Sequence, residues 1–170
     1  MTQGATERRL IEIIRRAAPP GAGVRVGIGD DCAVLEVGPG RLLLATTDLL
    51  MEDVHFRRRY AAPADIGWKS LAVNLSDIAA MGGRPRWALI ALACPEATSV
   101  EDAEAFYSGL GALAAEHDVA VVGGDTGASP GGWIVNVTLL GEATAPPVLR
   151  STARAGDVIA VTGSLGRSAA

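Results

Sequence analysis

The sequence predicts an α+β fold in which a mixed or antiparallel β-sheet is flanked by helices. Of its 170 residues, 49% are hydrophobic, and the mean hydropathy is +0.27, so the chain can bury a substantial core. Only 4% of the residues are aromatic, which indicates a core of small, closely packed aliphatic side chains. Segments with helical periodicity also alternate with short apolar segments that end at glycine turns.

Three segments have the periodicity of helices. The first, from Glu7 to Ala18, carries apolar residues at helical spacing and is ended by the sequence Pro19-Pro20-Gly21. The second covers residues 63–82 and opens with a proline, which suits a first helical turn. The third covers residues 99–118 and opens with the capping pattern of Ser99 and Asp102.

Short apolar segments beside turn signals are predicted to be strands. A Gly-Pro-Gly turn at residues 38–40 joins the first two of them into a hairpin. In chain order, the expected strands are Ala33–Val37, Arg41–Thr47, 87–94, 119–127 (a strand followed by a turn), 132–143 and 157–163. The final GSLGRSAA sequence has the pattern of a helix that begins and is not completed, which indicates a chain cut within an element.

Charge and composition exclude several classes of function. A net charge of -4 and a pI near 5.1 argue against a nucleic-acid partner, because a phosphate backbone requires a basic surface. Small anionic ligands stay possible if cations accompany them. Cys32 and Cys94 are far apart and form no CxxC motif, so neither a zinc site nor a disulfide framework is expected. Without a signal peptide or a run of about 18 apolar residues, the chain is expected to be cytoplasmic and free of membrane.

Acidic residues recur beside the expected strands and inside one expected helix. Their positions are Asp30 and Asp31 beside a strand start, Asp48 at a strand end, Asp77 inside the second helix and Asp125 just past a strand. Each of them, taken alone, is equally compatible with a turn or a solvated surface position. Only their convergence in space would make them a site.

Asp77 is the least compatible with a plain surface position. It lies one turn from Asn74 in an apolar helix, where a carboxylate is costly to bury unless it is paired or bound to a metal. Lys69 is the one lysine of the sequence, so cationic partners nearby are scarce. Together with the hydroxyl groups of Thr46 and Thr47, such carboxylates favour a hard cation such as Mg²⁺ over zinc.

Other motifs are weak or open to two interpretations. A Walker A sequence is absent, and GLGALA at residues 109–114 lies within an expected helix rather than after a strand. His117 is interpreted as structural, whereas His55 is equally compatible with a structural or a functional role. Arg57-Arg58-Arg59 is interpreted as a solvated loop edge that could also meet an anion. The glycines of Gly123-Gly124-Asp125 fit either an ordinary turn or a close approach to phosphate.

Six segments resemble motifs of one enzyme family, in family order and spacing. They are GIGDDCAVL, TTDLLMEDVHF, KSLAVNLSDIAAMG, FYSGL, VVGGDTG and ARAGDVIAVTGSLGRSAA. The set covers nearly the whole chain after Pro20 and is highly specific, although GGDT alone is not. The chain therefore resembles the thiamine-monophosphate kinases, which belong to the superfamily of aminoimidazole ribonucleotide synthetase. The expected fold is the N-terminal ATP-binding domain of that superfamily.

The resemblance implies ATP-dependent phosphorylation of thiamine monophosphate to thiamine diphosphate, with several Mg²⁺ ions, in a homodimer paired through its sheets. Carried over by motif, the metal ligands would be Asp31, Thr46, Thr47, Asp48, Asp77 and Asp125. ATP would meet Tyr107, Gly124, Asp125 and Arg150, and His55 would face the substrate. Neighbouring residues of an extended chain point to opposite sides, so one of Asp30 and Asp31 should face the metals while the other braces the turn. The family pattern favours Asp31, and the role of Asp30 stays open.

The implied reaction needs no catalytic side-chain base or nucleophile. The acceptor is a phosphate whose second pKa lies near about 6, so at neutral pH it is largely a dianion. The obstacle is repulsion, because two unit charges about 4 Å apart repel by roughly 4 kcal/mol at an effective dielectric of 20. Metal ions and positioning account for most phosphoryl-transfer catalysis, which predicts direct in-line transfer without a phospho-enzyme.

The chain departs from the family in length, because family members continue into a second α/β domain. We therefore expect an N-terminal helix at residues 1–20, an ATP- and Mg-binding dimerisation domain at 21–150, and the start of a truncated domain at 151–170. The isolated chain is expected to fold and dimerise, and its turnover is left open. Two alternatives stay open: another enzyme of the superfamily, such as a selenophosphate synthetase or a hydrogenase-maturation dehydratase, or a noncatalytic dimerisation or metal-binding module. A selenophosphate synthetase would carry a reactive cysteine or selenocysteine in a glycine-rich N-terminal segment, and none is present before Cys32.

Overall fold

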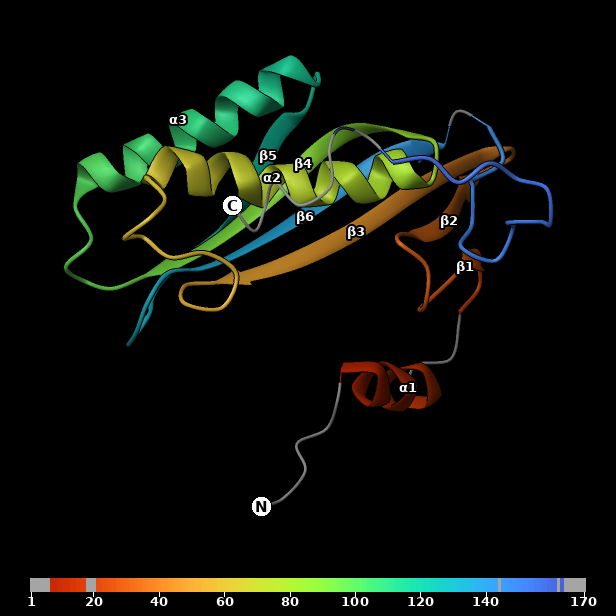
Figure 1. Cartoon of the computed structure of the whole chain (residues 1–170), viewed down its shortest axis with the longest axis horizontal. Helices are drawn as coiled ribbons and strands as arrows, with labels where there is room; N and C mark the ends of the chain where they lie inside the picture. Colours follow the sequence, from red (N-terminus) through yellow and green to blue (C-terminus); the bar gives the residue numbers. More distant parts are fainter. Residues whose placement is uncertain (1–6, 18–20, 144, 162, 164–170) are drawn as a thin grey trace.

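A six-stranded sheet in the order β1-β2-β3-β6-β4-β5 forms the centre of the fold (Figure 1). The computed structural model describes residues 7–17, 21–143, 145–161 and 163. The strands are β1 (Val24–Val26), β2 (Ala33–Gly38), β3 (Arg41–Met51), β4 (Gly83–Cys94), β5 (Ala120–Ala128) and β6 (Ile134–Ala143). All neighbouring pairs are antiparallel except β4 and β5, which are parallel. The predicted α+β class with a mixed sheet is confirmed.

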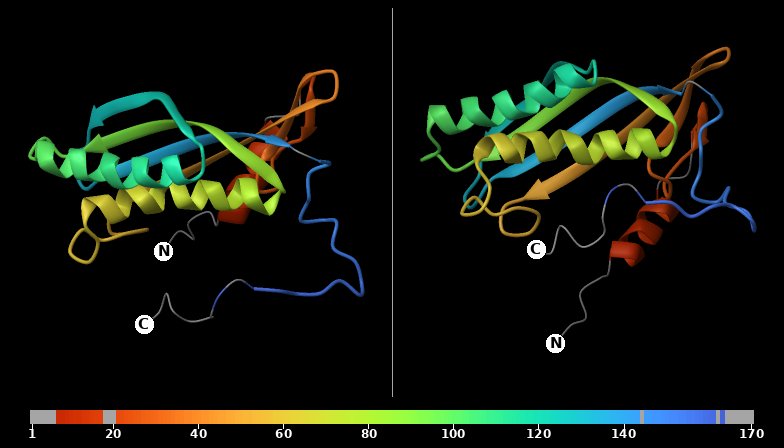
Figure 2. Two further views of the ribbon diagram at one scale, coloured as in Figure 1. Left: turned by 90° about the horizontal axis from the view of Figure 1, so that it is seen from above. Right: turned by 45° about the horizontal axis from the view of Figure 1, so that its top comes forward.

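Two helices cover one face of this sheet. They are α2 (Pro63–Ala80) and α3 (Val100–Glu116), and Figure 2 shows both on the same side of the strands. The helix α1 (Glu7–Ala17) stands apart from this layer (Figure 1). The helix face of the sheet is apolar by strand alternation, because Val135, Val137 and Leu139 of β6 are fully buried. The core therefore lies between the sheet and the pair α2 and α3.

Glycines allow α2 and α3 to approach each other closely. A Cβ added at Gly67 would lie 2.0 Å from the backbone oxygen of Phe106, and one added at Gly109 would lie 2.0 Å from that of Ala64. Such distances are far below van der Waals contact, so the helix backbones touch at these points. The two helices thereby form one closely packed layer, and the Asp77 end of α2 lies opposite β3.

The other face of the sheet carries no helix among the described residues. Side chains that alternate with the buried ones point to this side, and several large apolar residues there are partly exposed. They are Val37, Leu49, Met51, Trp87 and Leu89. We call this surface the open face.

Several element boundaries differ from the sequence prediction. The strand β3 continues past Thr47 to Met51, so Asp48 lies inside a strand rather than at its end. Likewise β5 runs through Asp125, which we predicted to follow the strand. Both strands extend because a neighbour supplies hydrogen-bonding partners along their full length: β6 pairs with β3 as far as Met51, and β4 pairs with β5 as far as Ala128. Local residue pattern does not contain that information.

Three other expectations are corrected or fall outside the structure. The short strand β1 was not predicted. The strand expected at residues 157–163 is wrong over 157–161, because this segment pairs with no strand among the described residues and leaves Val158 and Ile159 90% and 96% exposed. The helix expected in GSLGRSAA lies almost wholly outside the described residues. In the part of the chain that the structure describes, no helix is both long and apolar enough to span a membrane.

A pair of glycine substitutions in α3 should have opposite effects on stability. Gly109→Ala puts a methyl group into the Ala64 backbone, so we expect the free energy of unfolding to fall by about 1–3 kcal/mol. Gly111→Ala meets no atom within 4 Å, so the higher helix propensity of alanine should raise stability by up to about 1 kcal/mol. Urea unfolding of both variants measures the difference. Equal effects of the two substitutions would contradict the close α2–α3 packing.

Candidate functional site

An acidic hollow of about 480 Å³ lies where β2, β3 and the second half of α2 meet. It is lined by Ile11, Gly27, Ile28, Gly29, Asp30, Asp31, Ala33, Ala45, Thr46, Thr47, Asp48, Asp77 and Arg150. Six of these residues were predicted or suspected metal ligands, and a seventh, Arg150, was predicted to bind ATP. The fold therefore gathers positions from four separate segments into one cavity.

A hydrogen bond between sheet and helix organises this hollow. Thr46 points from β3 towards the helix face, and its Oγ1 donates to Oδ2 of Asp77 at 2.6 Å. Asp48 lies two residues further along β3, so strand alternation places its side chain on the same face. Asp48 and Asp77 are close enough that each carboxylate acts on the other.

The pKa of Asp48 records this proximity. Burial raises it above the usual aspartate value, the charge of Asp77 raises it further, and His55 acts in the opposite direction. The Cys32 thiol gives a second measure, since burial together with Asp77, Asp31 and Asp30 raises its pKa to about 12. Negative charge is thus concentrated at this point of the fold.

Asp30 and Asp31 enter the hollow from the loop before β2 and have different partners. The Asp30 carboxylate accepts backbone N–H groups, from Asp31 at 3.1 Å and from Arg150 at 3.3 Å. The Asp31 carboxylate instead pairs with the Arg150 side chain, whose Nε lies 2.9 Å from Oδ1. Asp30 therefore braces the loop, while Asp31 presents its side chain to a cation.

Thr47 lines the same hollow, but its hydroxyl group lies on the open face. Its Oγ1 is 3.0 Å from Oγ1 of Thr138 and accepts from Nδ2 of Asn136, also at 3.0 Å. This follows from alternation, because Thr46 next to it points to the helix side. A ligand role for the Thr47 hydroxyl stays a prediction, and this geometry directs that group away from Asp77.

Asp125 is not brought into the acidic hollow. With Tyr107 and Gly124 it lines a second hollow of about 450 Å³ between β4, β5 and α3. The register places Asp48, Val137, Ile90 and Gly124 in one row across four strands, so the two hollows are about 14 Å apart at the usual strand spacing. Three of the four predicted ATP-binding positions thus lie together, and Arg150 lies with the carboxylates.

Close pairing of two strands requires a glycine at position 124, and the sequence alone does not show this requirement. A Cβ at this position would lie 1.8 Å from the backbone oxygen of Ile90, so only glycine lets β5 pair so closely with β4. We interpreted this glycine as a site for close phosphate approach or a turn. Its packing against β4 is sufficient to require it.

His55 lies in the turn after β3 and does not line either hollow. Its Nδ1 accepts a hydrogen bond from the backbone N–H of Met51 at 3.0 Å, so a neutral ring carries its proton on Nε2. The ammonium group of Lys69 donates to the His55 carbonyl oxygen, which ties the turn to α2. The exposed ring therefore offers an N–H donor beyond the Asp48 end of the acidic hollow.

Two further residues have structural roles. Arg58, predicted to be a solvated loop residue or an anion contact, is half-buried, pairs with Asp102 and stacks 4.8 Å from the ring centroid of Trp133. Because Asp102 is distant from Arg58 in the sequence, a local pattern could not predict this ion pair. His117 is the C-cap residue of α3 through its backbone N–H, and the structural interpretation of its side chain stays a prediction.

The donor set of the acidic hollow fits a hard divalent cation. The available ligands are carboxylate and hydroxyl oxygens, and Mg²⁺ commonly takes one or two carboxylates together with water and substrate phosphates. Among the described residues, no three His, Cys, Asp or Glu side chains are arranged to hold a metal by themselves. Asp48 and Asp77 are two carboxylates of the required kind, and their role as metal ligands stays a prediction.

The chain belongs to the AIR synthase related protein family through its N-terminal domain, whose model matches residues 29–143. That match covers more than half of the chain and includes the loop of Asp30, the sheet from β2 onward, and both covering helices. The fold is thus that of a known domain family.

Within this family the chain is similar to thiamine-monophosphate kinases. It is 43% identical to the thiamine-monophosphate kinase of Bacillus subtilis over 86% of this chain and 46% of that protein. It is 40% identical to the Mycobacterium tuberculosis enzyme over 96% of this chain and 49% of that protein. The chain therefore spans about half the length of the curated relatives it matches.

Solved structures agree with this relationship. The structure of AaThiL complexed with AMPPCP and TMP matches with a TM-score of 0.78 and 40% identity, over 87% of this chain and 45% of that one. The hydrogenase-maturation complex HypE–HypF matches with a TM-score of 0.63 over 81% of this chain and 43% of that one, at 24% identity. This second likeness shows the shared fold alone.

The raised pKa of Asp48 predicts how stability depends on pH in metal-free protein. The folded state binds the Asp48 proton more tightly than the unfolded state, so this residue lowers stability as pH rises through its folded-state pKa. Asp48→Asn should therefore be more stable than wild type at pH 7, and the gain should disappear towards about pH 3.5, below the ordinary aspartate pKa. Chemical unfolding in EDTA across this range measures it.

The matched control is Asp118→Asn, because Asp118 is exposed and far from the hollow, where it pairs with Arg84 at 3.4 Å. This control should show no gain at pH 7. A stability difference for Asp48→Asn that is the same at every pH would show that packing, rather than charge, is responsible.

Proposed function

We propose that this chain is the ATP- and Mg-binding half of an enzyme that phosphorylates thiamine monophosphate to thiamine diphosphate. The observation that carries the proposal is the acidic hollow, in which Asp31, Asp48 and Asp77 converge from three separate segments, with Arg150 as the one cationic side chain among the described residues that line it. The similarity to thiamine-monophosphate kinases at about 40% identity supports the substrate assignment.

Metal binding is assigned to the residues of the acidic hollow, with Asp48 and Asp77 as its central pair. Mg²⁺ bound there would reduce the repulsion between two phosphate groups, which is the main obstacle to this reaction. Thr46 fixes the Asp77 carboxylate through its hydrogen bond, and Asp30 holds the loop that presents Asp31. Asp125 is assigned to the nucleotide side, because it lies with Tyr107 in the second hollow.

The substrate is assigned to the His55 end of the acidic hollow. The Nε2–H of His55 is a suitable donor to a phosphate oxygen because Nδ1 is already engaged. The phosphate of thiamine monophosphate is the nucleophile, so transfer from ATP is direct and in line. Among the residues of the hollow, aspartates and threonines position the groups, and we assign none of them as a nucleophile or base.

The domain arrangement follows from this assignment. Residues 1–20 provide an N-terminal helix, residues 21–150 the binding and dimerisation domain, and residues 151–170 the start of a second domain that completes the enzyme. The apolar residues of 157–161 are suited to pairing with that second domain, since they are exposed here. We place the reaction in the cytoplasm, where both substrates are available.

The enzyme assay should use the chain together with any coding sequence that follows Ala170. We expect thiamine diphosphate to form from thiamine monophosphate and ATP when Mg²⁺ is present, measured by chromatography. Absence of this product, with ATP consumed on a different acceptor, would favour another enzyme of the superfamily.

Calorimetry on the same protein separates a catalytic site from a noncatalytic module. Binding of a nonhydrolysable ATP analogue should require Mg²⁺ and should weaken at least tenfold in Asp48→Asn and Asp77→Asn, because each variant removes one ligand charge. Asp118→Asn removes the same charge outside the hollow and should leave binding unchanged. Unaltered binding in both hollow variants would favour a module without this site.

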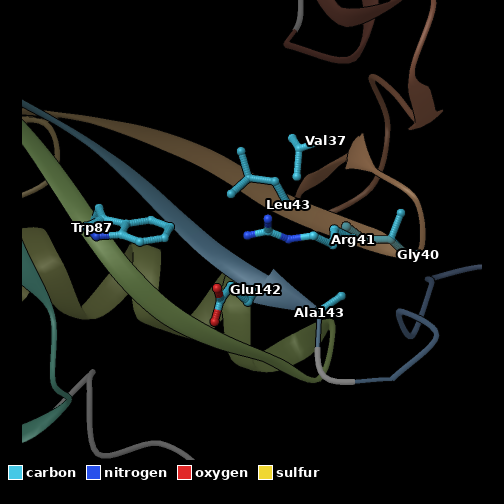
Figure 3. Close-up of a pocket in the computed structure, with 8 residues that line it drawn as sticks. Val37, Gly40, Arg41, Leu43, Trp87, Glu142 and Ala143 are labelled. Atoms are coloured by element: carbon cyan, nitrogen blue, oxygen red, sulfur yellow. The ribbon is translucent and has the colours of Figure 1, made fainter.

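We further propose that two copies pair through the open face. Large exposed apolar patches are rare on monomeric proteins. On the open face, exposed apolar side chains of β2, β3 and β4 lie side by side, and no helix of the described chain covers them. Figure 3 shows one end of this face, where Trp87, Leu43 and Val37 surround a hollow of about 400 Å³. Arg41 and Glu142 lie at the same place, so opposite charges are available for a symmetric contact.

A charge placed on the open face should dissociate this dimer. Leu89 is 38% exposed on β4, and Leu89→Arg would require burying an unpaired cation between the sheets. We expect a shift from dimer to monomer in sedimentation velocity. Val100→Arg, at an exposed position on the helix side, is the control and should leave the mass unchanged. A monomeric wild-type protein would refute the pairing.

A further inference from the structure

The guanidinium group of Arg150 occupies the cation position at Asp31. Its Nε lies 2.9 Å from Oδ1 of Asp31, and its Nη2 donates to the same oxygen. The backbone N–H of Arg150 also donates to Asp30, at 3.3 Å from Oδ2. One arginine therefore contacts both members of the aspartate pair, through side chain and main chain.

The segment that carries Arg150 is attached to the fold just before this residue and closes a turn just after it. The backbone N–H of Val148 donates to the carbonyl oxygen of Met81, just after α2, at 3.2 Å. Thr152 closes a turn on Leu149 through its N–H at 3.0 Å and its hydroxyl group at 2.7 Å. The Leu149 side chain packs against the core. Arg150 is thus held at the tip of a short, anchored turn.

The two partners differ in solvent exposure. The Arg150 side chain is 65% exposed, whereas that of Asp31 is 21% exposed. Exposed ion pairs contribute little to stability, so this contact can open without disturbing the rest of the fold. The backbone contacts of Val148 and Thr152 do not depend on it.

We propose that Arg150 is an internal counter-cation that competes with a divalent cation for the Asp31 carboxylate. Both would bind the Asp31 carboxylate, and a guanidinium group and a metal ion held on one carboxylate repel each other at close range. Binding of the metal at Asp31 releases the Arg150 side chain, while the turn keeps its backbone in place.

This competition couples the metal to the nucleotide, and that second step rests on the proposed function. A released guanidinium is free to pair with a nucleotide phosphate, for which its planar fork is well suited. Release of Arg150 by the metal raises the affinity for the nucleotide by some factor. By linkage, a nucleotide that binds Arg150 raises the affinity for the metal by that same factor. Arg150 thereby makes occupation of the site by metal alone less favourable than occupation by metal and nucleotide together.

The expected size of the effect follows from the fraction of protein in which Asp31 is free. An exposed ion pair is closed for roughly half to four-fifths of the time, so it weakens metal binding about two- to fivefold. Removing the guanidinium should remove this factor. The same change should reduce the gain in metal affinity that the nucleotide provides by that factor, because only the part transmitted through Arg150 is lost.

Isothermal calorimetry with Mg²⁺ on the 170-residue chain tests the competition without any enzymatic activity. Arg150→Ala should bind Mg²⁺ about two- to fivefold more tightly than wild type. Arg154→Ala is the matched control: it removes the same charge from the same segment, and among the described residues the exposed Arg154 side chain takes part in no ion pair or hydrogen bond. It should bind Mg²⁺ as wild type does.

The Nε–H resonance of Arg150 gives a direct second measurement. In wild type, Mg²⁺ should move this resonance towards the position of a solvated arginine, as the bond to Asp31 opens. Equal Mg²⁺ affinity in wild type and Arg150→Ala, or an unchanged resonance at saturating Mg²⁺, would overturn the proposal while leaving the proposed kinase function intact. Absence of Mg²⁺ binding in both proteins would overturn the competition and would also count against the metal site itself.

Discussion

The hydrogen bond from Thr46 to Asp77 is the contact on which the candidate site depends. It joins the central strand β3 to the last turns of α2, and it fixes an otherwise costly carboxylate at the boundary of the core. The close approach of α2 and α3 at Gly67 and Gly109 sets the distance between the two helices.

The carboxylates gathered in the acidic hollow need compensating partners, and only some of them have one. Arg150 balances Asp31, and backbone N–H groups stabilise Asp30, whereas Asp48 keeps a neighbouring carboxylate and a raised pKa. The unbalanced part of the site is therefore the Asp48–Asp77 pair. A hard cation is the partner that such oxygen ligands prefer, and a phosphate ligand then becomes acceptable beside them.

Sequence patterns predicted the elements whose signals are local. The periodicity of α2 and α3, the hairpin turn between β2 and β3, and the apolar strand β4 all have their causes within a few residues, so they were found to within a few positions. The lengths of β3 and β5, the short β1 and the irregular segment 157–161 depend on which strands lie alongside. The same holds for Arg58, whose partners Asp102 and Trp133 are remote in the chain.

The sequence by itself determined which chemistry was available: oxygen ligands for a hard cation, glycines beside an aspartate, and an arginine in the final third of the chain. Only the tertiary structure decided how these groups divide. It placed the hydroxyl groups of Thr46 and Thr47 on opposite faces, put Asp125 in a separate hollow, and paired Arg150 with Asp31. The reason is physical: side-chain direction follows strand register, and register is set by contacts between segments that are distant in the sequence.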